Sequence, residues 1–176
     1  APLSTHSLGK AGHATQLKVL EEKQLVIAST STGQLIVYKL TNSAPKNDRY
    51  ADAVPTLTEG HAWQITSGND LPCNAFDVFN SGQDGGGLAI VAVGEDGNAA
   101  MCLPEQSNSN AVYRSFGAID GFPIASVAWT DFKNMRFATG SNHLKIWDTK
   151  AMSNNKPAQI FKQYVVFFSP CKFFFF

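Results

Sequence analysis

Four histidines, His6, His13, His61 and His143, are the side chains of this sequence best suited to acid–base chemistry near neutral pH. A catalytic histidine must lie within hydrogen-bonding reach of the proton that it transfers, and it needs a pKa matched to that task. The spacing of these histidines and of the neighbouring carboxylates gives no reason to expect such an arrangement. We therefore expect His13, His61 and His143 to have structural roles, and we expect the protein not to be an enzyme.

The three cysteines, Cys73, Cys102 and Cys171, also lack a pattern that would indicate a site. They are odd in number, far apart and without CxxC spacing, which argues against a disulfide framework and against a zinc site. A reducing compartment is the simpler interpretation. Cys102 lies in an apolar run, where we expect a small core residue, because a reactive thiol needs a lowered pKa and a base beside it. The stretch "GQDGGG" at 82–87 lacks the Lys-Ser/Thr pair and the following helix of a phosphate loop, so a flexible loop explains it better.

Charge and length set the remaining limits. Fourteen basic and fourteen acidic residues cancel in this chain of 176 residues, so no long-range field attracts nucleic acid or an anionic membrane. Basic residues are not interleaved with aromatic ones, as they are in many nucleic-acid grooves. We expect one domain with a sizeable core, and no metal, cofactor, small-molecule ligand or direct nucleic-acid partner. The chain begins at Ala1 rather than Met, which leaves open that its true N-terminus and a localisation signal are missing.

The elements that would position any site are strands. β-Branched and aromatic residues recur in runs of about five, bounded by Gly, Asn, Asp and Ser, and this pattern predicts an all-β fold. Three segments share a plan of apolar strand, small polar turn and second strand, at residues 25–40, 88–103 and 135–150. Their alignment places Tyr38, Cys102 and Trp147 in one column, with spacings of 64 and 45 residues. The segments therefore predict an internal repeat.

Each of these hairpins has candidate neighbours that would complete a four-stranded unit. An inner strand is expected before each hairpin, at 14–20, 74–80 and 125–131. An outer strand is expected after each, at 51–57, 111–116 and 158–162, where Pro55 is acceptable only at a sheet edge. Polar stretches that cannot bury enough apolar surface to offset the entropy of ordering are placed as surface loops, at 41–56, 66–74 and 80–87.

Short motifs at the expected repeat boundaries resemble WD40 repeats, which recur every ~40 to 45 residues. The motifs are the Gly-His pairs at 12–13 and 60–61, the turn "GEDG" at 94–97, and Trp147-Asp148. This resemblance implies a β-propeller fragment of about three four-stranded antiparallel blades, at 12–59, 60–117 and 118–162, after a lead-in segment at 1–11. Because the full-length family member is expected to have seven blades, the three copies should form an open arc with exposed apolar faces on the first and third copies.

The resemblance also implies roles for individual residues. In WD40 repeats, a His, a turn Asp, a strand Ser or Thr and a Trp can form a hydrogen-bonded network that stabilises each blade. Matched by position, the first copy offers His13, Ser29 and Tyr38. The second offers His61 and Asp96, with Cys102 at the Trp position. The third offers Thr139, Asn142 and Trp147, and Asp148 completes its terminal Trp-Asp motif. No copy is complete, since Thr32 replaces the first Asp, Cys102 replaces a Trp, and Phe122 replaces the third His.

Within the WD40 family, residues 12–162 are similar to the middle of the small WD-repeat nucleoporins of the Y-shaped outer-ring complex. The most specific segments are "AVGEDG" after a long Cys-containing loop and "LKIWD" followed by "KPAQI". The similarity implies a scaffold subunit of the nuclear pore complex at the nuclear envelope, which supports nucleocytoplasmic transport through contacts with other outer-ring nucleoporins. The alternative is a WD40 adaptor of another complex, such as a ubiquitin-ligase substrate receptor or a chromatin-associated protein, because the fold permits it equally.

The last fourteen residues, "QYVVFFSPCKFFFF" at 163–176, do not continue the repeat. One interpretation is an aberrant end from a partial or mispredicted gene model, and the other is a membrane-active tail. Lys172 and Pro170 interrupt the segment, and no run approaches the ~20 apolar residues of a spanning helix, so we do not expect membrane insertion.

Overall fold

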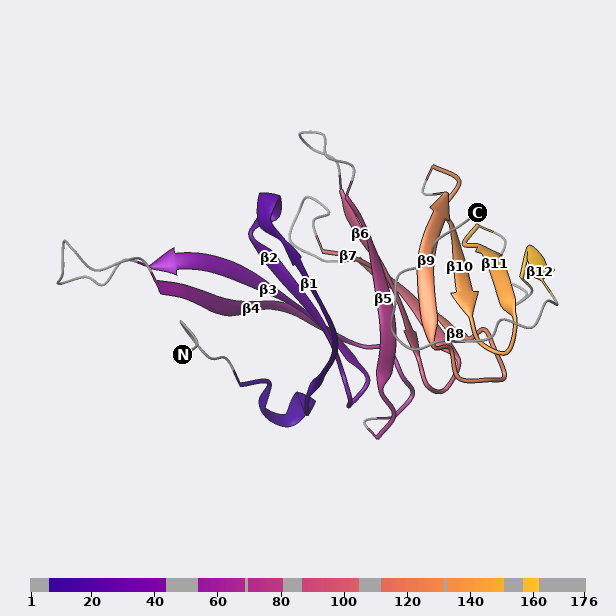
Figure 1. The fold of residues 1–176 in the computed structure, drawn as a ribbon, viewed down its shortest axis with the longest axis horizontal. Coiled ribbons are helices and arrows are strands. Elements are labelled where there is room, and N and C mark those ends of the chain that lie inside the picture. The colour runs from indigo at the N-terminus through magenta and orange to yellow at the C-terminus, as the bar shows by residue number, and fades with distance from the viewer. Residues whose placement is uncertain are drawn as a thin grey trace.

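The computed structural model describes residues 7–43, 54–68, 70–80, 87–104, 112–131, 133–150 and 157–161. Within these ranges the chain forms three separate four-stranded antiparallel sheets, and each sheet takes its strands in chain order (Figure 1). The prediction of an all-β chain of four-stranded antiparallel units is therefore confirmed. The predicted tail at 163–176 lies outside the described residues.

The strand bounds follow the hydrophobic pattern of the sequence. The first sheet contains β1 (Ala14–Leu20), β2 (Leu25–Thr30), β3 (Gln34–Ser43) and β4 (Val54–Gln64). The second contains β5 (Cys73–Asn80), β6 (Leu88–Gly94), β7 (Asn98–Leu103) and β8 (Val112–Ala118). The third contains β9 (Ser126–Asp131), β10 (Arg136–Gly140), β11 (Leu144–Asp148) and β12 (Gln159–Phe161). Two short 3-10 helices, η1 (Gly9–Ala11) and η2 (Glu21–Lys23), flank β1.

The three sheets stand one after another with their first strands adjacent (Figure 1). β5 contacts β1 and β2 of the first sheet, and β9 contacts β5 and β6 of the second sheet. Tyr38, Cys102 and Trp147 lie on β3, β7 and β11, the third strand of each sheet, as the alignment predicts. Their partners across the strand pairs are Val26, Ile90 and Phe137, so the three positions are equivalent in register. Across the described strands, the sheets do not close into a barrel.

The second sheet lies in the middle and is packed on both faces. β6 is buried along its whole length, and its side chains alternate between two cores. Leu88, Ile90 and Ala92 pack toward the first sheet, whereas Val91 and Val93 pack toward the third. A strand with sheets packed on both of its faces buries every side chain, so its residues are apolar at consecutive positions, as in "LAIVAVG".

The two outer faces of the assembly differ from each other. The outer face of the first sheet carries Val26, Ala28, Ile36 and Tyr38, and the N-terminal segment packs over it through Leu8 and Ala11. This segment covers the part of the face that β2 and β3 form. Leu17 and Val19 of β1 pair with Ala28 and Val26, so they lie on the same face, and they are exposed. The predicted exposed apolar face on the first copy is therefore present at β1 alone. The outer face of the third sheet is open and has a shallow apolar hollow of about 430 Å³, lined in part by Ala128, Ala138 and Leu144.

The end of the first sheet also differs from the predicted boundary at residues 59 and 60. β4 runs through that point to Gln64, and the second sheet begins at Cys73. Gly60-His61 is therefore part of the outer strand of the first sheet and does not precede an inner strand. A bulge between the partners of Val37 and Tyr38 accommodates Gly60 without ending the strand. Pro55 lies on this edge strand, opposite Asn42, as its missing amide hydrogen requires.

Candidate functional site

Each of the first two sheets is connected to the segment that follows it by a pair of backbone hydrogen bonds, and the two pairs are equivalent. The amides of Ile65 and Thr66 donate to the carbonyl of Gly33, at 2.8 and 3.4 Å. In the second sheet, the amides of Ile119 and Asp120 donate to the carbonyl of Gly97, at 3.0 and 3.3 Å. We call these contacts the first joint (Gly33, Ile65 and Thr66) and the second joint (Gly97, Ile119 and Asp120).

Both joints depend on a glycine in the turn of the central hairpin. Gly33 has a φ of 80° and Gly97 a φ of 77°, a left-handed conformation that other residues rarely adopt. A Cβ at Gly33 would overlap the hydroxyl of Thr66, and a Cβ at Gly97 would overlap the carbonyl of Asp120. The joint thus requires glycine for its backbone angle and for its space.

The first strands of neighbouring sheets are also tied together by side chains. The hydroxyl of Thr15 in β1 donates to the carbonyl of Cys73 in β5, and the amide of Asn74 in β5 donates to the carbonyl of Ile124 before β9. The Gln16 side chain both donates to and accepts from the backbone of Phe76, at 3.1 and 2.8 Å. Farther along β5, Asp77 accepts the amide of Trp129 in β9 at 2.8 Å. These bonds hold the sheets in sequence.

The residues matched to the WD network in the first copy do not meet. Ser29 shares a hydrogen bond of 2.7 Å with Thr15 and lies on the face toward the second sheet, whereas Tyr38 lies on the outer face. His13 is exposed, and its backbone amide donates to Ser31 at 3.2 Å. Burial, and secondarily the charge of Glu59, raise the pKa of the Tyr38 phenol.

The three predicted residues of the second copy also lie in three different surroundings. His61 lies on β4 and stacks on Trp63, with ring centroids 5.4 Å apart. Asp96 lies in the β6–β7 turn and accepts the amide and hydroxyl of Ser67, at 2.7 and 2.8 Å. Cys102 is fully buried in the core between the first and second sheets, where burial raises the pKa of its thiol.

The third copy brings two predicted residues together. The indole nitrogen of Trp147 donates to the hydroxyl of Thr139 at 2.8 Å, and both side chains are fully buried. Asp148 instead is at the surface, where its carboxylate accepts the amide of Lys150 at 3.0 Å and Nε of Arg136 at 3.2 Å. The amide of Lys150, and then the Arg136 guanidinium, lower the pKa of Asp148.

One buried polar cluster was not predicted from the sequence. The ammonium of Lys145 contacts the carboxylate of Asp120 at 2.6 Å, and the hydroxyl of Ser141 donates to the same oxygen at 2.7 Å. The side chain of Asp120 is 1 % exposed, so this pair joins the second joint to the third sheet. A usable sequence signal existed in the repeated Ile-Thr at 65–66 and Ile-Asp at 119–120, each placed just after an outer strand.

The described residues offer little to support covalent or metal chemistry. Burial raises the pKa of Cys73 to about 12, so this thiol stays protonated at neutral pH and is a poor nucleophile. Among the described residues, no group of three or more His, Cys, Asp and Glu side chains is placed to hold a metal ion. Within the same ranges, no helix has the length and apolar character needed to cross a membrane.

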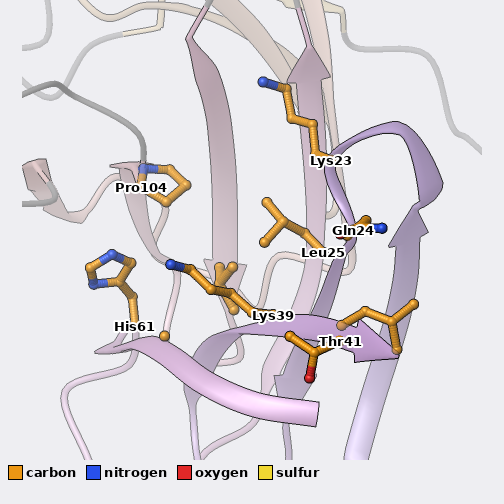
Figure 2. A pocket seen from close by; sticks show the side chains of 10 residues that line it. Lys23, Gln24, Leu25, Lys39, Thr41, His61 and Pro104 are labelled. Carbon is orange, nitrogen blue, oxygen red and sulfur yellow. The ribbon is translucent and has the colours of Figure 1, made fainter. Parts of the chain in front are cut away.

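A concave site with mixed character lies where the first two sheets diverge. Figure 2 shows this hollow of about 330 Å³, which lies over β3 and β4 and is bordered by Pro104 after β7. Its floor includes Leu25 and Val37, and its polar lining includes Lys39 and His61. Neither the protein-family models nor the curated proteins that were compared with the chain give a match.

Proposed function

We propose that this protein is a non-catalytic β-propeller subunit of the outer-ring scaffold of the nuclear pore complex. The observation that carries the proposal is the succession of three four-stranded sheets, in which the first two end in equivalent joints and all three carry an equivalent third-strand position. Repeated sheets with one plan are what a propeller requires. The order of the motifs from residue 12 to 162 supports the nucleoporin assignment within the WD40 family.

The proposed function uses surface complementarity and requires no bound cofactor. Stacked sheets form a rigid body, and the segments that connect their strands present partner-binding surfaces at its two ends. The partners in this proposal are other nucleoporins of the outer ring, and the place of action is the nuclear envelope, where the scaffold supports nucleocytoplasmic transport.

The open face of the third sheet imposes a structural requirement on this proposal. Ala128 is exposed there, and Leu144 and Ile146 are only half-buried. A propeller sheet packs against a neighbour on each face, since stacking is what buries its apolar surface. A further sheet should therefore cover this face in the assembled protein.

The proposal is tested in cells with the full-length protein tagged at its chromosomal locus. We expect a signal at the nuclear rim and, after a salt wash, outer-ring nucleoporins as the main stable partners. Diffuse cytoplasmic staining together with retained cullin adaptors, or with subunits of a histone-modifying complex, would contradict the nucleoporin assignment. That result would favour the alternative, a WD40 adaptor of another complex.

A further inference from the structure

We propose that two copies of this chain associate end to end, with the first strand of each copy packed into the apolar hollow on the open face of the other copy's third sheet. The first and third sheets lie at opposite ends of the molecule (Figure 1). The inference rests on the stacking of sheets in the proposed propeller, and it names the sheet that covers the open face. It does not depend on the assignment to the nuclear pore.

Each sheet begins with a strand that carries two apolar residues on one face. They are Leu17 and Val19 in β1, Phe76 and Val78 in β5, and Val127 and Trp129 in β9. In each sheet, the second of these residues pairs with the residue that in turn pairs with Tyr38, Cys102 or Trp147. The three apolar pairs are therefore equivalent in register.

The burial of these apolar pairs differs between the first sheet and the other two. In the second and third sheets the pair packs into the core shared with the preceding sheet, where Phe76 is 2 % exposed. In the first sheet, Leu17 is 58 % exposed and Val19 is 46 % exposed. β1 thus carries the same kind of apolar pair as β5 and β9 and leaves it in contact with solvent.

The hollow on the third sheet lies where the repeat places the first strand of a following sheet. β5 contacts the first two strands of the first sheet, and β9 contacts the first two strands of the second sheet. The hollow lies over the corresponding strands of the third sheet, β9 and β10. At the position of Ala128, the first two sheets have Lys18 and Asp77, which form a salt bridge at 3.5 Å. The third sheet is therefore apolar where the other two are charged.

The lining of the hollow suits the two side chains of β1. Ala128 pairs with Ala138 across β9 and β10, and Gly140 follows on the same face of β10. These small residues leave space that the larger side chains of Leu17 and Val19 fill. Burial of both side chains removes apolar surface from water on each partner, which favours association.

The arrangement of the two ends determines the size of the assembly. Leu8 and Ala11 pack over the part of the first sheet that β2 and β3 form, and this leaves the β1 part of the face open. Contacts between two different faces form either an open chain or a closed ring. Three sheets in each copy give six in a pair, and closed propellers have ~4 to 8 blades. The expected assembly is a closed dimer with two identical contacts.

The test is analytical ultracentrifugation of the full chain over a range of concentrations. We expect the mass of two chains at high concentration and dissociation on dilution. Leu17→Lys and Ala128→Asp each place an unpaired charge in an apolar contact that the dimer contains twice. Each variant should therefore weaken association on the order of a hundredfold or more. Both side chains are exposed in the single chain, so thermal unfolding of the variants should stay close to that of the parent.

The matched control is Phe122→Lys, which changes a side chain that is 54 % exposed in the β8–β9 connection. This variant should associate like the parent chain. An equimolar mixture of the Leu17→Lys and Ala128→Asp chains should associate more tightly than either variant alone. One contact of the mixed dimer is unchanged, and the other contact pairs the introduced lysine with the introduced aspartate.

The mass of a single chain at every concentration, or equal association of the Leu17→Lys and Phe122→Lys variants, would overturn the proposal. Protection of Ala128 from a soluble paramagnetic agent in such a monomer would assign the hollow to another segment of the same chain. Pairing of two first sheets would respond to Leu17→Lys and not to Ala128→Asp, and a mass that rises beyond two chains would contradict the closed dimer. These results leave the localisation test of the proposed function unaffected, so the two proposals can fail separately.

Discussion

The first and second joints have the same main-chain bonds and different side chains. In both, a left-handed glycine accepts amide hydrogens from an isoleucine and the residue after it. At the first joint that residue is the neutral Thr66, whose single hydroxyl hydrogen lies within reach of two carbonyls, that of Gly68 at 2.8 Å and that of Leu71 at 3.0 Å. At the second joint it is Asp120, which forms a buried pair with Lys145.

The cores beside the two joints also have different side chains at equivalent positions. Cys102 fills its position between the first and second sheets as a small buried thiol. At the equivalent position between the second and third sheets, Trp147 packs with Phe137 and bonds to Thr139. The comparison teaches that this repeat is defined by backbone geometry, and that side chains at equivalent positions vary while they still fill the interface.

The largest expected effect comes from breaking the ion pair at the second joint. Lys145→Met removes the cation and leaves Asp120 charged and buried, which typically costs ~3 to 5 kcal/mol of unfolding free energy. Chemical denaturation of the variant and its parent measures the difference. The double variant Asp120→Thr with Lys145→Met imitates the first joint and should recover most of the loss. A double variant no more stable than Lys145→Met would show that the two joints are not interchangeable.

A smaller but still large effect is expected at the shared glycine. Gly97→Ala introduces a strained φ and a Cβ that overlaps the Asp120 carbonyl, with an expected loss of about 2 kcal/mol or more in unfolding free energy. Gly33→Ala should behave similarly because it overlaps Thr66. The control is Gly117→Ala, where φ is also positive but a Cβ meets no atom within 4 Å. Equal losses for Gly97→Ala and Gly117→Ala, measured by thermal and chemical denaturation, would argue against close packing at the joint.

A third effect distinguishes the two cores. Trp147→Phe keeps an aromatic ring but removes the hydrogen bond to Thr139, which leaves a buried hydroxyl without this donor and costs ~1 to 2 kcal/mol. Thr139→Val in the Trp147→Phe background should add little, and a double-mutant cycle measures the coupling between the two side chains. Zero coupling would mean that the bond does not contribute to stability.

The smallest effect is expected at the surface of the third sheet. The pKa of Asp148 is lowered in the folded protein, so its charge contributes stability above its ordinary pKa, and this contribution is lost as the pH falls through the lower, folded value. Asp148→Asn should lower the denaturation midpoint slightly at pH 7, and the difference from the parent should disappear as the pH falls through the folded pKa of Asp148. A difference that grows on acidification would contradict this assignment.

Several features of the fold follow directly from the sequence, because they depend on local pattern. The inner strands and hairpins are predictable from apolar runs such as "LAIVAVG", whose length and turn residues identify strands without reference to the rest of the chain. The equivalence of Tyr38, Cys102 and Trp147 follows from the spacing of those hairpins, and the structure places all three on third strands.

Other features depend on contacts between distant residues, and the sequence pattern does not show them. The Gly60-His61 pair resembles the start of a WD40 repeat, but glycine also occurs at strand bulges, and the bulge in β4 is set by its pairing with β3. The N-terminal cover over Tyr38 and the pair between Asp120 and Lys145 involve packing that no local period indicates. The hollow beside Lys39 likewise forms only because residues of β4 and Pro104, which are distant in sequence, border the same space.

Hydrogen exchange at the joints tests most directly the central claim that the sheets are successive copies of one repeat. The amides of Ile65 and Ile119 each donate to a turn glycine of the sheet before them, at 2.8 and 3.0 Å. Both should exchange on the order of a hundredfold or more slowly than in an unstructured peptide, and at rates similar to each other. If either amide exchanges as fast as a free peptide while the strands stay protected, that joint does not exist in solution and the three sheets are not copies of one repeat.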